Sequence, residues 1–238
     1  MYIFGKNVAK EALKNNKKIN RAYISKDFSD KNIISLLQKE NIGIEYVTKF
    51  ELDKIEKGNH QGIILSVPEF KYCDLDDLLT NPKPFLVILD HIEDPHNFGA
   101  IIRTCEAAGV DGIIIPKDRS ALVNSTVMKT SAGALNNMKI CMVTNLNRSI
   151  KMLKDKGLWI IATDMDNSIP YDKVDYNIPV ALVIGNEGTG ISRLIRDEAD
   201  YVVNIPMVGK INSLNASVAA GIMIYKVFEK RNWFNERI

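Results

Sequence analysis

The chain has 238 residues and a mass of 26.7 kDa, with 46% hydrophobic and 25% charged residues. This composition is typical of a globular protein and excludes disordered, collagen-like and low-complexity chains. The net charge of +2 neither favours nor excludes an acidic partner, but the charge is unevenly distributed. Residues 1–26 hold seven Lys and Arg residues and one acidic residue, Glu11. Such a cluster suits a phosphate backbone, and a solvated helix face is an equally good interpretation.

Neither export nor membrane insertion is expected. The N-terminus has no apolar signal segment, and the longest weakly polar stretch, residues 216–225, is far shorter than the ~20 residues that span a bilayer. Cys73, Cys105 and Cys141 are widely spaced and form no CxxC pair. This pattern favours a reducing cytoplasm and argues against disulfides and a zinc site. We therefore expect a cytoplasmic protein that holds no metal.

The first 70 residues are predicted to form a small α/β domain. The periodicity indicates helices at 7–15, 31–40 and from Thr48 onward, and strands at 21–25, 44–47 and 62–67. Residues 68–84 are acidic, contain Pro82 and Pro84, and show no sustained periodicity beyond one short helical turn. We interpret residues 71–83 as a linker between this domain and a second one over 84–238.

The second domain alternates short apolar runs with helical segments. The runs lie at 85–90, 112–116, 139–143, 158–163 and 180–185, and the helices are expected near 98–108, 145–156, 192–198 and 213–231. Strands that are apolar on both faces belong to a parallel sheet covered by helices on both sides. We therefore predict a doubly wound α/β fold, whose ligand normally lies at the carboxyl ends of the strands. The loops after residues 85–90, after 180–185 and after Ile205 are the candidates for chemistry.

The first of these loops runs from Asp90 to Arg103 and carries many polar groups. Asn97 is well placed to cap the helix expected to begin at Phe98, by accepting a hydrogen bond from a free backbone N–H. Arg103 follows in the second turn among apolar residues, so that it either extends to solvent or points into a cleft. A purely structural Asn97 and a surface Arg103 are the alternatives.

The second loop, Gly185 to Gly190, contains three glycines directly after an apolar strand. Glycines at a strand end let the backbone approach a ligand closely and expose its N–H groups. The spacing matches neither the dinucleotide nor the nucleoside triphosphate loop, since Ile191 stands where the latter needs Lys. Glu187 would repel a phosphate, which indicates a ligand that is not anionic there. A tight strand-to-helix turn without a ligand is the alternative.

The third segment, Ile205 to Gly221, leads into the final predicted helix. Ser213 or Asn212 is expected to cap this helix, which would put Asn215 and Ser217 in its first turns. Its small residues form a face that another backbone can approach closely. Alone, this pattern would indicate ordinary helix packing.

Taken together, the three segments resemble the signature motifs of the SpoU (TrmH-like) family of RNA ribose 2′-O-methyltransferases, of the SPOUT class. The matching sequences are DHIEDPHNFGAIIRT, VIGNEGTGI and IPMVGKINSLNASVAAGI, in the order of the family. Residues 1 to about 70, with FGKNVAKEAL and NHQGIILSV, resemble the L30e-like RNA-binding domain of one branch. The branch most similar to the chain comprises the bacterial 23S rRNA guanosine 2′-O-methyltransferases, with tRNA and thiostrepton-resistance enzymes as relatives.

The resemblance implies a fold that the residue pattern does not predict. It is an α/β sheet with a C-terminal trefoil knot, which general topology rules would exclude, preceded by the small L30e-like domain. It also implies S-adenosylmethionine held in the knot, with Gly185, Ile205 and Leu214 contacting it largely through the main chain. Family members are homodimers through the knot.

The resemblance also assigns roles in the reaction, which needs no metal. Arg103 would activate the ribose hydroxyl, and because a guanidinium is a poor base we favour stabilisation of the developing alkoxide. Asn97 would orient Arg103 or the ribose, and Glu187 would fix the loop or Arg103. Ser213 and Asn215 would hold the sugar or phosphate near the cofactor.

Three residues of the basic N-terminal segment, Lys14, Lys17 and Lys18, are expected to contact RNA because they lie in the domain that the resemblance assigns to RNA binding. His91 and His96 could be proposed as bases, but a His in a polar loop is more often a hydrogen-bonding or surface residue, and both rank below Arg103.

The sequence thus favours a 23S rRNA guanosine 2′-O-methyltransferase, with a tRNA 2′-O-methyltransferase and a non-catalytic RNA-binding protein as alternatives. A decayed site should have lost at least one of the five predicted catalytic residues, and all five are present. A third alternative is an α/β enzyme that acts on a small molecule and uses another nucleotide as its cofactor. The missing GxGxxG motif and the basic N-terminal segment disfavour it.

Overall fold

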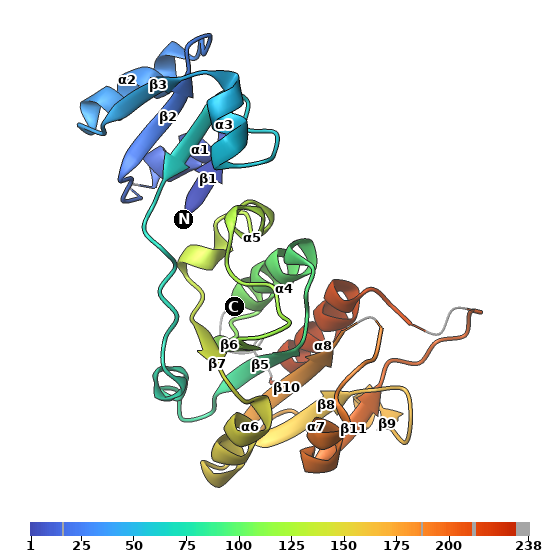
Figure 1. The fold of residues 1–238 in the computed structure, drawn as a ribbon. Helices are drawn as coiled ribbons and strands as arrows, with labels where there is room; N and C mark the ends of the chain where they lie inside the picture. The colour runs from blue at the N-terminus through green and yellow to red at the C-terminus, as the bar shows by residue number, and fades with distance from the viewer. Residues whose placement is uncertain (16, 187, 211–212, 232–238) are drawn as a thin grey trace. The chain divides into compact units, whose positions relative to one another are not determined.

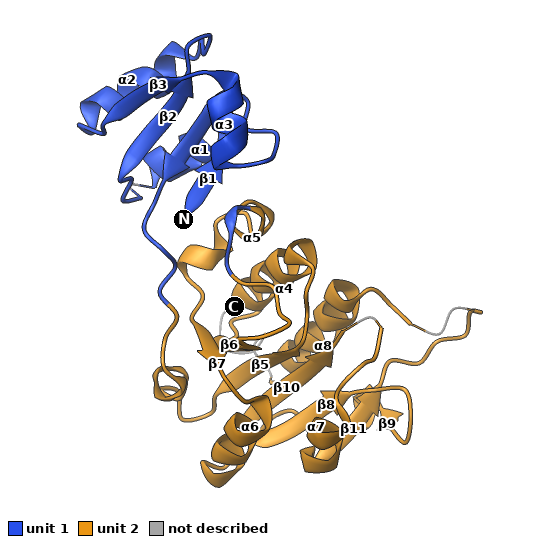
Figure 2. Cartoon of the chain, in the orientation of Figure 1, with its two compact units in different colours: residues 1–71, 123–125 blue, residues 72–122, 126–238 orange. Residues whose placement is uncertain are grey.

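The computed structural model describes residues 1–15, 17–186, 188–210 and 213–231 (Figure 1). The chain divides into two compact units (Figure 2). Unit 1 comprises Met1–Lys71 with Val123–Ser125, and unit 2 comprises Tyr72–Leu122 with Thr126–Ile238. Among the described helices, none is both long and apolar enough to cross a membrane.

Unit 1 is a four-stranded mixed sheet with three helices. The strands follow the order β1-β4-β2-β3, in which β4 is antiparallel to both neighbours and β2 and β3 are parallel. The strands are β1 Tyr2–Phe4, β2 Arg21–Ser25, β3 Ile44–Val47 and β4 Ile63–Ser66, and the helices are α1 Lys6–Lys14, α2 Lys31–Lys39 and α3 Lys49–Ile55.

Two of these helices begin at side-chain caps that the sequence supplies. The Asp30 carboxylate accepts a hydrogen bond from the backbone N–H of Ile33, at the start of α2. At the start of α3, Thr48 Oγ1 accepts from the Glu51 N–H, and the Glu51 carboxylate accepts from the Thr48 N–H at 2.7 Å. These reciprocal bonds form a capping box, and the bond from the Thr48 backbone holds the pKa of Glu51 below its usual value.

Unit 2 is built on a seven-stranded sheet in which every pairing is parallel, with the order β7-β6-β5-β10-β8-β11-β9. The strands are β5 Phe85–Asp90, β6 Gly112–Pro116, β7 Ile140–Val143, β8 Trp159–Thr163, β9 Ile169–Pro170, β10 Val180–Gly185 and β11 Tyr201–Asn204. The predicted parallel α/β fold is confirmed. The knot stays a prediction.

Helices cover both faces of this sheet, which explains why its strands are apolar on both sides. In Figure 1, α4 and α8 pack together on one face and α6 and α7 on the other. The helices are α4 Pro95–Ala107, α5 Ser125–Thr130, α6 Leu146–Asp155, α7 Arg193–Glu198 and α8 Ala216–Lys230, and short 3₁₀ turns occur at Leu75–Leu78, Ala134–Asn136 and Tyr171–Lys173. Neither β9 nor α5 is predicted by the sequence pattern.

The prediction that Asn97 caps α4 is wrong. The helix begins at Pro95, and the Asp94 carboxylate accepts the hydrogen bond from the His96 N–H at 2.9 Å. Proline is favoured at the first helical position because its fixed φ suits the helix and its missing N–H is not needed there. The helix therefore starts three residues earlier than predicted, and Asn97 lies inside it.

The predicted cap of the last helix is also wrong. α8 begins at Ala216, and Asn215 is the N-cap, with its Oδ1 accepting from the N–H groups of Ser217 and Val218 at 3.0 and 3.4 Å. Ser213 precedes the helix in non-helical backbone. Asn212, the other predicted cap, lies outside the described residues.

Part of the segment predicted as a linker packs into unit 2. Leu78 is 1% exposed and belongs to the core between the sheet and the α6–α7 face. A Cβ added to Gly112 at the start of β6 would lie only 2.4 Å from Leu78 Cδ2, so a larger residue there would displace the Leu78 side chain. Cys73 donates its N–H to Ile140 O beside β7.

The three cysteines are free thiols; Cys105 and Cys141 are buried and Cys73 is partly buried. Burial raises the pKa of the Cys141 thiol to about 12, so at neutral pH this group is a small apolar side chain.

Candidate active site

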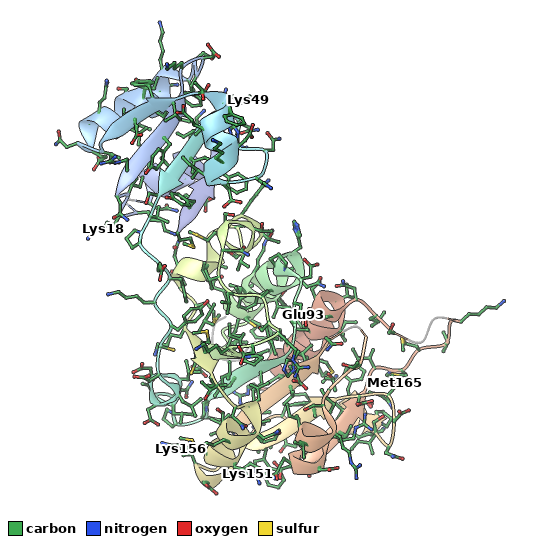
Figure 3. The ribbon with its side chains drawn as sticks, in the orientation of Figure 1. Lys18, Lys49, Glu93, Lys151, Lys156 and Met165 are labelled. Carbon is green, nitrogen blue, oxygen red and sulfur yellow. The ribbon has the colours of Figure 1, made fainter. Side chains whose placement is uncertain are left out.

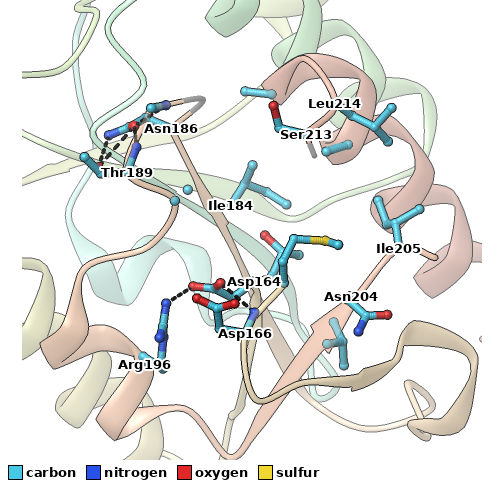
Figure 4. Close-up of a pocket in the computed structure, with 18 of the residues that line it drawn as sticks. Asp164, Asp166, Ile184, Asn186, Thr189, Arg196, Asn204, Ile205, Ser213 and Leu214 are labelled. Carbon is cyan, nitrogen blue, oxygen red and sulfur yellow. Dashed lines mark hydrogen bonds and ion pairs between the residues drawn. The ribbon is translucent and has the colours of Figure 1, made fainter. Parts of the chain in front are cut away.

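A cavity of about 290 Å³ lies at the carboxyl edge of the parallel sheet (Figure 4). Its walls come from the segments that follow β8, β10 and β11 and from the first turns of α8. The three predicted cofactor contacts, Gly185, Ile205 and Leu214, all line it, as does Ser213. We refer to this cavity as the edge pocket. It brings together residues from two of the three sequence motifs.

The glycine loop beside the pocket is folded tightly back on itself. The backbones of Asn186 and Gly190 exchange hydrogen bonds of 3.2 and 3.1 Å, and Gly190 has a φ of +65°. A Cβ added to Gly185 would lie 2.2 Å from the carbonyl carbon of Gly190, closer than any real contact. The Asn186 Oδ1 accepts from the N–H groups of Gly188 and Thr189. Gly185 is therefore required by the close approach of its own loop.

The far end of the glycine loop is anchored to β5 by a buried carboxylate. Asp90, the last residue of β5, is 1% exposed, and its Oδ2 accepts a 2.7 Å hydrogen bond from the Ser192 N–H. Its Oδ1 lies 2.5 Å from Nδ1 of His91. The Asp90 carboxylate thus fixes where α7 begins. Asp90 is not among the predicted site residues, although its position at the end of an apolar strand is a usable signal.

The edge pocket also holds an ion pair that the sequence analysis missed. The Arg196 guanidinium donates to the Asp164 carboxylate, which also accepts a hydrogen bond from the Asp166 N–H at 3.2 Å (Figure 4). Asp164 directly follows β8, whose neighbour in the sheet is β10. Because strand order cannot be read from the sequence, the sequence did not predict that the loop after β8 lies beside the glycine loop.

Two predicted residues from different motifs contact each other. Asn215 Nδ2 donates a 3.1 Å hydrogen bond to Asn97 Oδ1, which joins the start of α8 to the first turn of α4. Asn97 is 8% exposed. Neither side chain is among the described residues that line the edge pocket, whereas the neighbours Ser213, Leu214 and Ala216 are. The pair therefore holds the pocket-lining segment against α4.

The other two predicted catalytic residues are placed differently. Arg103 lies on α4 with an exposed side chain, outside the lining of the edge pocket, and makes no hydrogen bond or ion pair with another described residue. Glu187 lies outside the described residues. The structure therefore does not bring Arg103 into the pocket itself.

The three predicted RNA contacts belong to unit 1. Lys14 ends α1 and is exposed, and Lys18 is exposed as well (Figure 3). Lys17 is half-buried, and burial lowers the pKa of its ammonium group. Lys14 and Lys18 are thus better placed than Lys17 to meet a solvated polymer.

The described part of the chain contains no cluster of three or more His, Cys, Asp or Glu side chains arranged to hold a metal ion.

Family models match both halves of the chain. The SpoU rRNA Methylase family matches residues 84–225, and the domain described as RNA 2′-O ribose methyltransferase substrate binding matches residues 2–73. Similar proteins include YacO of Bacillus subtilis strain 168, which carries a provisional TrmH family tRNA/rRNA methyltransferase name. It is 41% identical over 239 residues, covering 97% of this chain and 96% of its own. A Staphylococcus saprophyticus protein with the same provisional family name is 41% identical over 243 residues, covering 99% and 98%.

Solved structures show the same architecture. The AdoMet-bound rRNA methyltransferase from Sinorhizobium meliloti is 26% identical, with a TM-score of 0.75 and coverage of 96% of this chain and 86% of its own. The A. aeolicus TrmH/SpoU tRNA modifying enzyme is 34% identical, with a TM-score of 0.60 over 67% and 81% of the two chains. The predicted resemblance is confirmed: the chain belongs to the SpoU (TrmH) family of RNA methyltransferases.

Proposed function

We propose that the chain transfers a methyl group from S-adenosylmethionine to a ribose 2′-hydroxyl of RNA, and that the substrate is a guanosine of 23S rRNA. The observation that carries this proposal is the edge pocket, which gathers Gly185, Ile205, Leu214 and Ser213 at the carboxyl edge of the sheet. The two family descriptions, which speak of rRNA and of 2′-O ribose methylation, support the substrate class. An enzyme of this kind acts in the cytoplasm, where its RNA is found.

The edge pocket fits the methyl donor chemically. Its volume of about 290 Å³ is just below the usual range for small-molecule sites, about 300–1,000 Å³. The side chains of Ile184, Ile205 and Leu214 offer apolar surface for a flat purine, and the loop amides and the Asp164 carboxylate offer polar partners. When bound, S-adenosylmethionine supplies an electrophilic methyl carbon on a positively charged sulfur.

The chain's own residues position the ribose, and its 2′-hydroxyl gives up its proton to solvent water during the transfer. A guanidinium stays protonated in proteins, so Arg103 stabilises the negative charge that develops on the 2′-oxygen instead of removing the proton. Its exposed side chain, without a partner among the described residues, is free to meet an RNA held over the pocket. Ser213 offers its hydroxyl to the sugar or phosphate at the pocket rim. Much of the acceleration then comes from holding hydroxyl and methyl group in line.

We also propose that the chain acts as a homodimer through the predicted knot, with α8 contributing to the interface. Val218 and Tyr225 are seven residues apart on this helix, and therefore on one face of it, and they are 50% and 48% exposed. A second copy would remove this surface from water. Sedimentation of the pure chain should give twice the 26.7 kDa mass, and a Val218→Asp variant should sediment as a monomer.

The test of the substrate is a map of ribose methylation in 23S rRNA and tRNA from cells with and without the protein. One 2′-O-methylguanosine of 23S rRNA should disappear with the protein. If a 2′-O-methylated nucleotide of tRNA disappears instead, the substrate is tRNA. If no site changes while the pure chain binds RNA, the chain is a non-catalytic RNA-binding protein.

A further inference from the structure

A second hollow, of about 550 Å³, lies entirely within unit 1, and the proposed reaction does not use it. It opens between the start of α1, the β2–α2 loop, the first turns of α3 and the loop that leads into β4. Its lining includes the side chains of Lys6, Asp27, Phe28, Lys49, His60 and Gln61. We call it the unit 1 hollow.

A buried histidine fixes one wall of this hollow. His60 is 4% exposed, its Nδ1 accepts a 3.0 Å hydrogen bond from the Gly62 N–H, and its Nε2 lies 3.0 Å from the Asp53 carboxylate. With Nδ1 accepting, the proton is on Nε2 and is donated to Asp53. This arrangement ties the 56–62 loop to α3. The hollow is therefore preformed and need not be assembled by its ligand.

The same loop brings the backbone against an aromatic ring. Gly62 has a φ of +83°, and a Cβ added there would come within 3.1 Å of the Phe28 ring. Phe28 is partly buried and lines the hollow, and the Lys6 ammonium lies 5.4 Å from the centroid of its ring. The Lys6 backbone N–H donates to Gln61 Oε1 at 2.9 Å, which holds α1 to the loop. The Phe28 ring thus lines the hollow, with the Lys6 cation over it.

The charges around the hollow are of both signs and lie at different places. Lys6 and Lys49, the first residues of α1 and α3, supply two cations, and Lys49 extends from the surface of unit 1 (Figure 3). The Asp27 carboxylate is exposed in the β2–α2 loop and accepts no hydrogen bond from another described residue. An aromatic ring, two cations and a free acceptor match the three parts of a nucleotide: base face, phosphate and base edge.

We propose that the unit 1 hollow takes a single unstacked nucleotide of the RNA substrate, with its base against Phe28 and its phosphate near Lys6 and Lys49. The inference rests on the proposed function, because it assumes that the chain binds RNA. It goes beyond that function by assigning unit 1 a pocket for one splayed base, where a basic surface alone would contact only the backbone. Single-stranded loops and bulges supply such bases.

The experiment measures binding of a fluorescein-labelled single-stranded RNA of eight uridines to the full chain by fluorescence anisotropy. Phe28→Ala should weaken binding at least about 5-fold, as expected for the loss of one stacked base, while Phe28→Tyr, which keeps the ring, should bind like the unmodified chain. Phe50→Ala is the matched control, because Phe50 is an aromatic residue of the same unit, 67% exposed and outside the hollow. Lys6→Gln and Lys49→Gln should each make the slope of log affinity against log salt concentration shallower, by the amount expected for about one phosphate contact.

Two results would overturn the inference: equal affinity of Phe28→Ala and the unmodified chain, or equal losses for Phe28→Ala and Phe50→Ala. Circular dichroism of each variant and its affinity for S-adenosylmethionine, whose proposed pocket is built from residues of unit 2, show that the variants are folded. If the unmodified chain methylates RNA and Phe28→Ala binds the oligonucleotide normally, only the hollow is wrongly assigned. If the unmodified chain neither binds nor methylates any RNA, the proposed function itself fails.

Discussion

The edge pocket of unit 2 and the hollow of unit 1 differ in what they are made of. The pocket depends on backbone, because Gly185 and Gly190 approach so closely that no side chain fits between them. The hollow depends on side chains, with Phe28, Lys6 and Lys49 on a frame held by His60. A small cofactor of one fixed shape suits a rigid backbone site. A polymer of variable sequence suits separate side chains, each of which contributes a part of the affinity. A single substitution should therefore abolish ligand binding in the pocket, whereas each substitution in the hollow should remove only part of the affinity for RNA.

The largest effect is expected for Gly185→Ala. The new methyl group would stand 2.2 and 2.5 Å from the carbonyl carbon and oxygen of Gly190, so the loop must move out of its position beside the pocket. We expect titration calorimetry to show an affinity for S-adenosylmethionine reduced more than about 100-fold, or about 2.7 kcal/mol. Gly43→Ala is the control, because a Cβ at Gly43 meets no atom within 4 Å. Affinity within threefold of the unmodified chain would refute the backbone site.

Arg103→Ala should come next, with a kcat about 100-fold lower, as is usual when one donor to a developing oxyanion is lost. Because Arg103 does not line the pocket, the affinity for S-adenosylmethionine should stay unchanged. Arg148→Ala, an exposed Arg on α6, is the control. The rate of methyl transfer to 23S rRNA is measured for both variants under single-turnover conditions. If Arg103→Lys kept most of the activity, with a rate that rose with pH as the lysine lost its proton, Arg103 would act as the base instead.

A smaller effect is expected for Asn215, which caps α8 and also donates to Asn97. Asn215→Ala removes both interactions and should cost about 1–2 kcal/mol of unfolding free energy in a urea titration. Asn215→Asp keeps the cap oxygen and loses only the donor to Asn97, so it should cost less. Equal losses for the two variants would mean that the bond between α8 and α4 carries the stability and the cap does not.

The smallest effect concerns unit 1 and its capping box. The pKa of Glu51 is lowered mainly by the hydrogen bond from the Thr48 backbone, so the folded state binds the proton more weakly than the unfolded state. The stabilisation is thus complete above the unfolded pKa and is lost as the pH falls through the folded one. Glu51→Gln should slightly reduce hydrogen-exchange protection of unit 1 at pH 7, and the difference from the unmodified chain should vanish near pH 3. A difference that persisted in acid would exclude the charge as its cause.

The sequence predicted the strands of unit 2 well, because apolar runs such as 85–90 and 180–185 are bounded by turn residues and buried on both faces. It predicted the helix starts less well. At α4, several residues in a row can serve as the cap, and Asp94 and Pro95 prevailed over Asn97. At α8 the chain stays non-helical through Ser213 and Leu214, so the cap falls on Asn215. Which of several polar residues caps a helix depends on packing that a local pattern does not contain.

The two sites also depend on tertiary contacts that a local sequence pattern does not contain. The motifs predicted Gly185, Ile205 and Leu214, which line the edge pocket, but Asp164 and Arg196 line it only because β8 pairs with β10. The unit 1 hollow draws its side chains from four separate segments. Two of these lie in the stretches FGKNVAKEAL and NHQGIILSV, but the sequence does not show that the four segments meet. Residues that follow one another in a loop can be predicted as a site, whereas residues that a sheet brings together cannot.

Methyl transfer to a ribose is measured most directly with an isotopically labelled methyl group. The pure chain is incubated with S-adenosylmethionine carrying an isotopically labelled methyl group and with 23S rRNA, and the RNA is digested to nucleosides. We predict that the label is recovered in 2′-O-methylguanosine and that Arg103→Ala abolishes most of it. Label recovered in a methylated base, or no transfer to RNA by a chain that binds S-adenosylmethionine, would contradict the account.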